Sequence, residues 1–278
     1  MHAGRAARVE QSAVGAGSSE PRVNTKLGTA LLTLLTRLAG PARVDYEDND
    51  PYTTSKLSRL FGTDVRDRLL GKVVVDFGSG RGADAVNAAL SGATRVVGVE
   101  IRPEYVKKSR ALAQAHEVSD RCSFLSPIEE TSKYAALYGQ CDYVVTLDTF
   151  EHFSDPAAAF DEMYRLLKPG GSLLISFGPP WMHPYGAHMR HFNKFPWLHV
   201  IFREQDVLAV ENAGAARYEE TISGPNRMTV RQFEELAQST RFSCVRLRCT
   251  AIWGLSWLAK GPTREYFTSI IDCEMIKT

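Results

Sequence analysis

Residues Val73 to Ala85 read VVVDFGSGRGADA, and this stretch predicts the fold of the whole chain. Three valines lead into an acid, Asp76, and the glycines Gly78, Gly80 and Gly82 then alternate with other residues before an alanine-rich segment. The pattern indicates a buried strand, a tight turn and the start of a helix. Glycine lets the backbone of such a turn approach a ligand closely, and the free N–H groups at the helix start face that ligand. A nucleotide-type ligand is therefore expected at this turn.

The composition is typical of a globular protein, with 44% hydrophobic and 23% charged residues among 278. A net charge of +1 gives no general attraction to nucleic acid or to anionic membranes. No run reaches the roughly 18 apolar residues of a membrane-spanning helix, so no stable membrane insertion is expected. The five cysteines are odd in number and form no C-x-x-C pair. They read as reduced, buried residues, and a cytoplasmic protein is expected.

Three regions are expected along the chain. Residues 1–25 are rich in Ala, Gly and Ser and read as a disordered tail. Residues 26–70 form a helical arm, in which five leucines (Leu27, Leu31, Leu34, Leu35 and Leu38) have helical spacing and residues 53–70 read as a second helix. The arm packs on the main domain, or it serves as a lid or a surface-seeking helix; its polar face has too few Lys and Arg to favour the last interpretation. The main domain is expected over residues 71–278.

Strand-like and helix-like segments alternate after the glycine turn. We expect strands at 95–101, 122–125, 142–147 and 172–177, and helices at 83–90, 103–116 and 154–168. This alternation predicts a parallel sheet covered by helices on both faces. A capping box at Thr229 then begins another helix, and residues 244–252 and 265–277 read as an antiparallel pair of strands at the sheet edge.

Two ligand classes compete for the turn. Residues Gly78 to Ala83 can be fitted to the dinucleotide pattern G-x-G-x-x-G/A, with Glu100 about 20 residues later as a ribose ligand. Three features favour a different ligand: the acid Asp76 two residues before the first glycine, the third glycine at Gly82, and the closing helix–strand–strand unit. An NAD-dependent oxidoreductase on a similar sheet remains the alternative from another functional class.

Four motifs occur together between about Leu70 and Lys277. They are Asp76-x-Gly78-x-Gly80-x-Gly82, the acid Glu100 that closes the second strand, DYVVTLDTFEHF at 142–153 and LKPGG at 167–171. In these motifs the sequence resembles the class I S-adenosylmethionine (SAM)-dependent methyltransferases of the small-molecule type. The resemblance implies a Rossmann-like sheet of seven strands in the order 3-2-1-4-5-7-6, with strand 7 antiparallel.

The resemblance also implies SAM as the cofactor and a set of residues that bind it. Asp76 would face the cofactor's ammonium and Glu100 its ribose hydroxyls, because a carboxylate accepts two hydrogen bonds well. The expected set is Asp76, Gly78, Ser79, Gly80, Gly82, Glu100, Ile101, Thr146 and Leu147. The acid that the family often carries after its third strand is absent, since Ser126-Pro127-Ile128 stands there and the next acid is Glu129. The adenine contacts therefore stay open.

His152 is the expected general base, because it directly follows the fourth strand and imidazole suits the deprotonation of a hydroxyl. The alternative is that His152 only orients the following loop. Asp148, Glu151 and His152 also form a D-x-x-E-H cluster, which is similar to the E-x-x-E-H metal site of some family members. His183, His188 or His191 could add a ligand. Asp is shorter than the Glu of that motif, so we expect no metal.

Residues 179–214 interrupt the alternation and are rich in aromatic residues and histidine. The family builds its substrate lid here, so Trp181, His183, Tyr185, His188 and His191 are expected to face the acceptor. A structural excursion or a homodimer surface is the alternative. We expect O-methylation of a small, fairly apolar or aromatic acceptor, with no nucleic-acid partner. A quinone or lipid acceptor met at a membrane surface is the second reading within the class, and a relative that binds the cofactor without turnover is a third.

Overall fold

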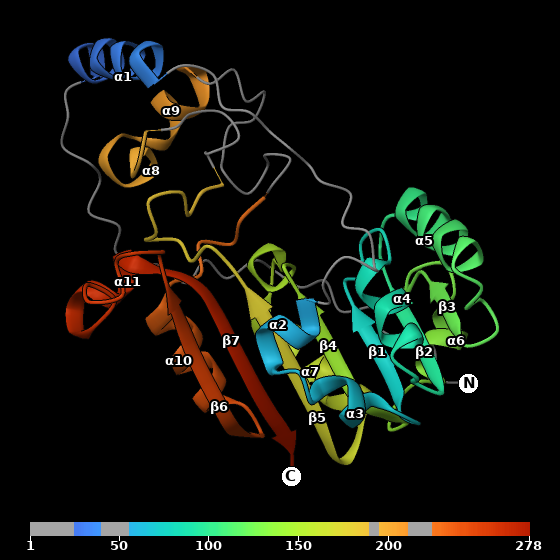
Figure 1. The fold of residues 1–278 in the computed structure, drawn as a ribbon. Coiled ribbons are helices and arrows are strands. Elements are labelled where there is room, and N and C mark those ends of the chain that lie inside the picture. Colours follow the sequence, from blue (N-terminus) through green and yellow to red (C-terminus); the bar gives the residue numbers. More distant parts are fainter. Residues whose placement is uncertain (1–24, 40–55, 189–194, 211–223) are drawn as a thin grey trace, which may run out of the picture.

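A seven-stranded sheet runs through the centre of the computed structural model, which describes residues 25–39, 56–188, 195–210 and 224–278 (Figure 1). The strands are β1 Val73–Phe77, β2 Arg95–Val99, β3 Cys122–Leu125, β4 Cys141–Leu147, β5 Leu167–Phe177, β6 Phe242–Ala251 and β7 Thr268–Lys277. Their order is β3-β2-β1-β4-β5-β7-β6. This confirms the predicted order.

The strand directions follow the prediction as well. β1 lies parallel to both β2 and β4, and β7 lies antiparallel to both β5 and β6. The central strands are buried on both faces, which explains why they read as continuous apolar runs rather than alternating ones. In Figure 1 the parallel strands point toward the end of the molecule that carries α1 Thr25–Ala39, α8 Leu198–Ile201 and α9 Glu204–Val210.

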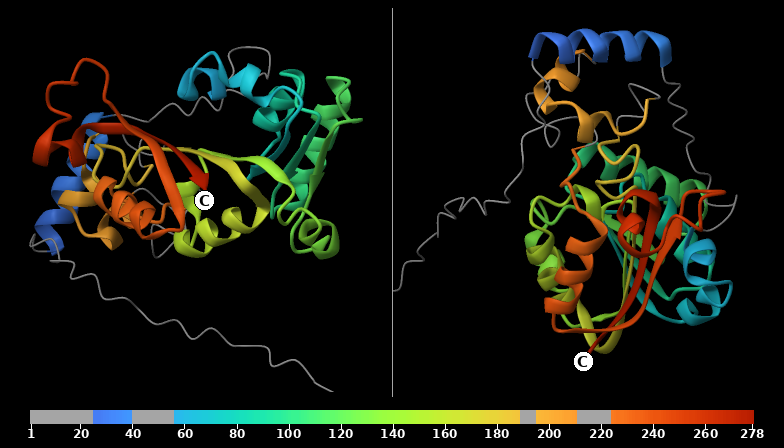
Figure 2. Two further views of the ribbon diagram at one scale, coloured as in Figure 1. Left: turned by 90° about the horizontal axis from the view of Figure 1, so that it is seen from below. Right: turned by 90° about the vertical axis from the view of Figure 1, so that its left-hand side faces the viewer.

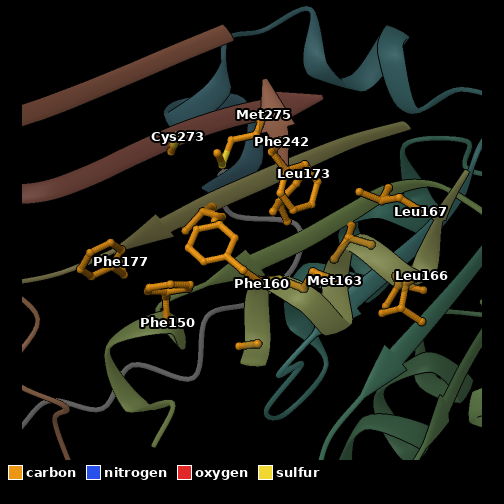
Figure 3. Packing of buried hydrophobic residues seen from close by; sticks show 14 of the residues in the cluster. Phe150, Phe160, Met163, Leu166, Leu167, Leu173, Phe177, Phe242, Cys273 and Met275 are labelled. Atoms are coloured by element: carbon orange, nitrogen blue, oxygen red, sulfur yellow. The ribbon is translucent and has the colours of Figure 1, made fainter. Parts of the chain in front are cut away.

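Helices cover the two faces of the sheet and enclose two apolar clusters (Figure 2). One face carries α2 Lys56–Phe61, α3 Val65–Leu69, α4 Ala83–Leu90 and α5 Pro103–Ala115. The other carries α6 Thr131–Ala135, α7 Pro156–Leu166 and α10 Val230–Ser239. Figure 3 shows the apolar cluster on the face that α6, α7 and α10 cover. There the Phe150 ring lies between Phe160 and Phe177 at centroid distances of 5.1 and 5.4 Å. Phe150 thus anchors the segment after β4 in this cluster.

A third, smaller cluster lies between the N-terminal arm and the segment expected to form the lid. It joins Leu32 of α1 to Leu198, Phe202, Val207 and Leu208 of the α8–α9 segment. Thr29 of α1 also donates a hydrogen bond to Asp206 of α9 at 3.4 Å. The N-terminal arm and the segment after β5, far apart in the sequence, therefore form one layer, which we call the lid layer.

Several expected boundaries are wrong. The single helix expected over 53–70 is two helices, because Gly62 adopts a φ of 102° between α2 and α3. The strand expected from residue 265 begins at Thr268, after a helical turn α11 Arg264–Phe267. β5 begins at Leu167 rather than at residue 172. The tail expected over 1–25 falls almost wholly outside the described residues. None of the described helices combines the length and hydrophobicity that crossing a bilayer requires.

Candidate functional site

The glycine turn packs tightly on one side and is open on the other. Gly78 has a φ of 82°, and a Cβ there would lie 2.3 Å from Cγ2 of Thr149. Gly80 has a φ of 52°, and a Cβ there would meet no atom within 4 Å. Both conformations suit glycine. Gly78 is therefore required by the protein's own packing, whereas Gly80 leaves space beside the backbone.

Glu100, at the end of β2, is held against this turn. Its carboxylate accepts hydrogen bonds from the backbone N–H of Gly80 at 2.9 Å and of Arg102 at 3.0 Å. The Arg102 guanidinium lies 3.3 Å away. Glu100 is only 5% exposed. The arrangement fixes an acceptor group next to the open side of Gly80.

Asp76 is buried, and one of its carboxylate oxygens lacks a hydrogen bond within the described residues. Its Oδ2, like Oγ of Ser79, is buried and has no hydrogen-bond partner among the described residues. Burial, and then the nearby carboxylate of Asp84, raise the pKa of Asp76 well above its ordinary value, while Lys56 opposes the shift. A buried carboxylate of this kind is stabilised by a cationic or hydrogen-bonding ligand.

The ends of the neighbouring strands add exposed apolar residues and a hydrogen bond to the last residue of β4. Ile101 and Ile128 follow the adjacent strands β2 and β3 and are 63% and 70% exposed. Thr146 is buried, and the carbonyl of Leu147 accepts the Thr149 hydroxyl at 2.9 Å. Open space at Gly80, an unsatisfied buried acid, the Glu100 acceptor and exposed apolar residues together fit SAM, which has an ammonium, a ribose diol and an adenine ring.

The segment after β4 carries the histidine expected to act. Phe150–His152 form a 3-10 turn, η1, from which the His152 side chain is exposed. Its Nδ1 lies 3.5 Å from the carbonyl oxygen of Gly224, and its ring lies 5.3 Å from that of His188 by centroids. The His152 side chain therefore lies where η1 meets the lid layer.

Glu151, the neighbour of His152 in η1, is buried. It is 3% exposed; Oε1 accepts from the N–H of Gly178 at 3.4 Å, and Oε2 has no partner among the described residues. Burial, and next the charge of Asp148, raise the pKa of Glu151 to about 8.

Ligand atoms of Glu151, His152 and His188 all lie within 4.8 Å of one another. Asp148 is not part of this group: it has a φ of 50° and pairs with Lys56 at 2.8 Å instead. The structure thus keeps two members of the D-x-x-E-H cluster together and replaces the third by a lid histidine. Glu and His are common ligands of divalent metals.

The other lid residues show mixed surroundings. His183 is buried and accepts a hydrogen bond from the N–H of Tyr185 at 3.1 Å. The ring of Trp181 packs on His199 at 4.8 Å, and the guanidinium of Arg227 lies 5.3 Å above it. His191 lies outside the described residues.

Two residues that the sequence did not single out hold the site together. The backbone N–H of Asn226 donates to Glu151 O at 2.6 Å, and its side-chain amide donates to the carbonyls of Phe150 and Phe153 at 2.9 and 3.0 Å. Lys56, in the arm, reaches the acid-rich side of the glycine turn. Both contacts join segments distant in sequence, so no local pattern signals them.

A family model described as a methyltransferase domain matches residues 47–247. The chain belongs to the class I SAM-dependent methyltransferase family. The match includes the glycine turn, Glu100 and η1. SAM is accordingly the cofactor of this chain's family.

Two curated relatives show how far the similarity extends. The ribosomal protein L11 methyltransferase of Photobacterium profundum is 33% identical over 127 residues, which are 45% of this chain and 39% of that protein. The ubiquinone biosynthesis O-methyltransferase of Psychrobacter cryohalolentis is 34% identical over 109 residues, which are 39% of this chain and 41% of that protein. The matches thus span about two fifths of each relative.

Solved structures share the fold at low sequence identity. Magnesium protoporphyrin IX methyltransferase from Synechocystis PCC 6803, with bound SAH (the demethylated cofactor), has a TM-score of 0.51 and 17% identity, covering 90% of this chain and 94% of that one. The cyclase SpnF has a TM-score of 0.50 and 15% identity, covering 90% and 93%. One fold thus carries different activities.

Proposed function

We propose that this protein transfers a methyl group from SAM to an oxygen atom of a small, fairly apolar or aromatic acceptor. The carrying observation is the position of His152, exposed beside His188 at the end of η1, the turn that follows β4. The aromatic lid layer supports an apolar acceptor, because such ligands are bound mainly by apolar and aromatic walls. The name of the ubiquinone biosynthesis relative agrees with transfer to oxygen.

When bound, SAM supplies a methyl carbon activated by positive sulfur. The chain's residues would position the reactants and move one proton. His152 would take the proton of the acceptor hydroxyl, while the methyl group would pass from the sulfonium to that oxygen and leave SAH. If His152 Nδ1 carries a hydrogen, it faces Gly224 O, so that Nε2 is the basic atom. Asp76 would bind the ammonium of SAM and so help to hold the donor in position.

Labelled SAM tests the proposal directly. The full-length protein is incubated with a panel of aromatic and apolar hydroxy compounds, with matched amines, and with protein and RNA preparations as competing acceptor classes. Label is expected in a hydroxy compound. Transfer to the amines, to protein or to RNA instead would contradict the assigned acceptor.

A membrane-held lipid or quinone acceptor is a second candidate, favoured by one feature of α1. Leu27, Leu31, Leu34 and Leu38 form a stripe along this helix and are 45–75% exposed. Exposed apolar helix stripes bind lipid surfaces when enough area is buried. Activity on a long-chain hydroxy-aromatic acceptor is expected to rise when vesicles carry it. A Leu27→Gln, Leu38→Gln double variant that retains full vesicle-dependent activity would contradict this candidate.

A further inference from the structure

Lys56 extends from the start of α2 to the carboxylates beside the glycine turn. Its Nζ lies 2.8 Å from Oδ2 of Asp148 and 3.8 Å from Oδ2 of Asp84. Asp148 follows β4, and Asp84 lies in the first turn of α4, after β1 and the turn. One side chain of the N-terminal arm therefore bridges the ends of the two strands that flank the donor site.

Three carboxylates of this cluster face two cationic side chains, Lys56 and, from the same helix, Arg59. Asp76, Asp84 and Asp148 face the Lys56 ammonium, and Asp76 Oδ2 is buried without a partner among the described residues. Burial raises the pKa of Asp84, and Lys56 opposes this. Burial also works against the charged form of Lys56, but Asp148 and Asp84 outweigh it and raise its pKa. The cluster would therefore be stabilised by a further cation.

The amino-acid portion of SAM supplies such a cation together with an anion. Its ammonium suits the excess of carboxylates, and its carboxylate would be repelled by them unless a positive group is within reach. Lys56 is that kind of group: its side chain is 22% exposed and bonded to the same acids. A flexible ammonium on a long stem can change partners at little cost.

The other end of α2 is fixed, so the Lys56 backbone has a defined place. Arg246 and Arg248 of β6 both donate hydrogen bonds to the carbonyl oxygen of Leu60, at 3.1 and 2.8 Å. Leu57 and Phe61 are buried in the apolar cluster below. The helix therefore presents Lys56 to the donor site as a fixed element of the fold.

We infer that Lys56 binds the carboxylate of SAM and so selects a cofactor with an intact amino-acid group. The inference rests on SAM being the cofactor and is independent of the acceptor chemistry proposed above.

Calorimetry of SAM and of decarboxylated SAM, which keeps the ammonium and the sulfonium, tests the inference on the full chain. The wild type is expected to prefer SAM by roughly tenfold or more, the range of one charge-assisted hydrogen bond. Lys56→Gln should remove this preference, weakening SAM binding while leaving decarboxylated SAM binding unchanged or stronger. Arg66→Gln removes the same charge from an exposed position of the neighbouring helix α3 and should keep the preference.

A uniform loss of affinity for both ligands in Lys56→Gln, or an equal affinity of the wild type for both, would overturn the inference. Thermal unfolding should change little, since a partly exposed pair contributes about 0–1 kcal/mol. If Lys56→Gln does not fold, Lys56→Arg keeps the charge and should retain the preference for SAM; its loss there would count against the inference. Failure of the wild type to bind either ligand would instead overturn the cofactor assignment itself.

Discussion

Gly78 and Gly80 share a left-handed backbone but differ in what surrounds them, and the difference can be measured. Gly80→Ala is expected to fold, with a strain cost of about 1–3 kcal/mol, because its Cβ meets no protein atom within 4 Å. It should weaken SAH binding, because the methyl group enters space that the ligand needs. Gly78→Ala places its Cβ 2.3 Å from Thr149 and should destabilise the fold itself.

Thermal unfolding and calorimetry with SAH separate the two effects. Gly80→Ala should lose affinity with a small change in melting temperature, and Gly78→Ala should lose melting temperature first. Full SAH affinity in Gly80→Ala would show that the cofactor does not pass over this residue.

His152 is expected to act in the chemical step. His152→Ala should lower turnover by roughly 10²- to 10⁴-fold, as for the loss of a general base, while SAH affinity stays unchanged. His116→Ala, at the end of α5, is the matched control and should keep full turnover. Chelation should leave wild-type turnover unchanged; a loss restored by Mg²⁺ or Mn²⁺, and absent in His188→Ala, would assign His152 to a metal site instead.

Glu151 makes stability depend on pH. With its pKa raised from the ordinary 4.5 to about 8 by burial and Asp148, the folded chain keeps a proton that the unfolded chain releases. The free energy of unfolding therefore falls as the pH rises from about 4.5 to 8. Asp76 and Asp84, whose pKa values burial also raises, add to the fall, so Glu151→Gln should remove only the share of Glu151. At about 1.4 kcal/mol per pKa unit this share is on the order of 3 kcal/mol between pH 5 and pH 8.

Urea unfolding at both pH values provides the measurement. Glu129→Gln, on an exposed acid, should behave as the wild type does. Equal pH dependence in the wild type and Glu151→Gln would mean that Glu151 is charged in the folded state.

At the scale of elements, Asn226 fastens η1 to the chain returning from the lid. Asn226→Ala removes three side-chain hydrogen bonds, the two donated to the carbonyls of Phe150 and Phe153 and the one accepted from the N–H of Met228, each contributing about 0.5–1.5 kcal/mol. Because η1 carries His152, the change should lower kcat while SAH affinity stays constant. Asn226→Asp keeps the size but loses the donors and should behave similarly. A kcat equal to that of the wild type would show that Phe150 packing alone positions the turn.

Helices and strands that depend on neighbouring residues could be predicted from the sequence, whereas contacts between distant segments could not. β3 and α4 match the expected ranges to the residue, because short apolar runs between glycine and proline signals define them. The capping box at Thr229 is present. The lid helices α8 and α9 and the Asn226 and Lys56 contacts were missed, since they depend on packing between segments more than 20 residues apart. The glycine turn and Glu100 could be predicted; their partners across the chain could not.

At the scale of the whole molecule, separate apolar clusters hold the sheet and the lid layer. The methyltransferase domain match over residues 47–247 includes the glycine turn, and the cyclase SpnF shares the fold. Under the proposed function, we expect the acceptor to be selected by what covers the carboxyl ends of the strands. In this chain that cover is built from both α1 and the α8–α9 segment, held by one small apolar cluster.

Leu32 should be the weak point of that cover. It is fully buried in the lid cluster, and Leu32→Ala is expected to cost about 2–5 kcal/mol there. Because this cluster is distinct from the two that hold the sheet, the loss should appear as local opening. Limited proteolysis should then cut near residues 198–210 sooner than in the wild type, while SAH affinity is retained.

Leu31→Ala, on the 45% exposed side of the same helix, is the matched control and should be cut at the wild-type rate. Equal protection in Leu32→Ala would mean that α1 does not hold the lid, and loss of SAH binding would mean that lid and sheet unfold as one unit.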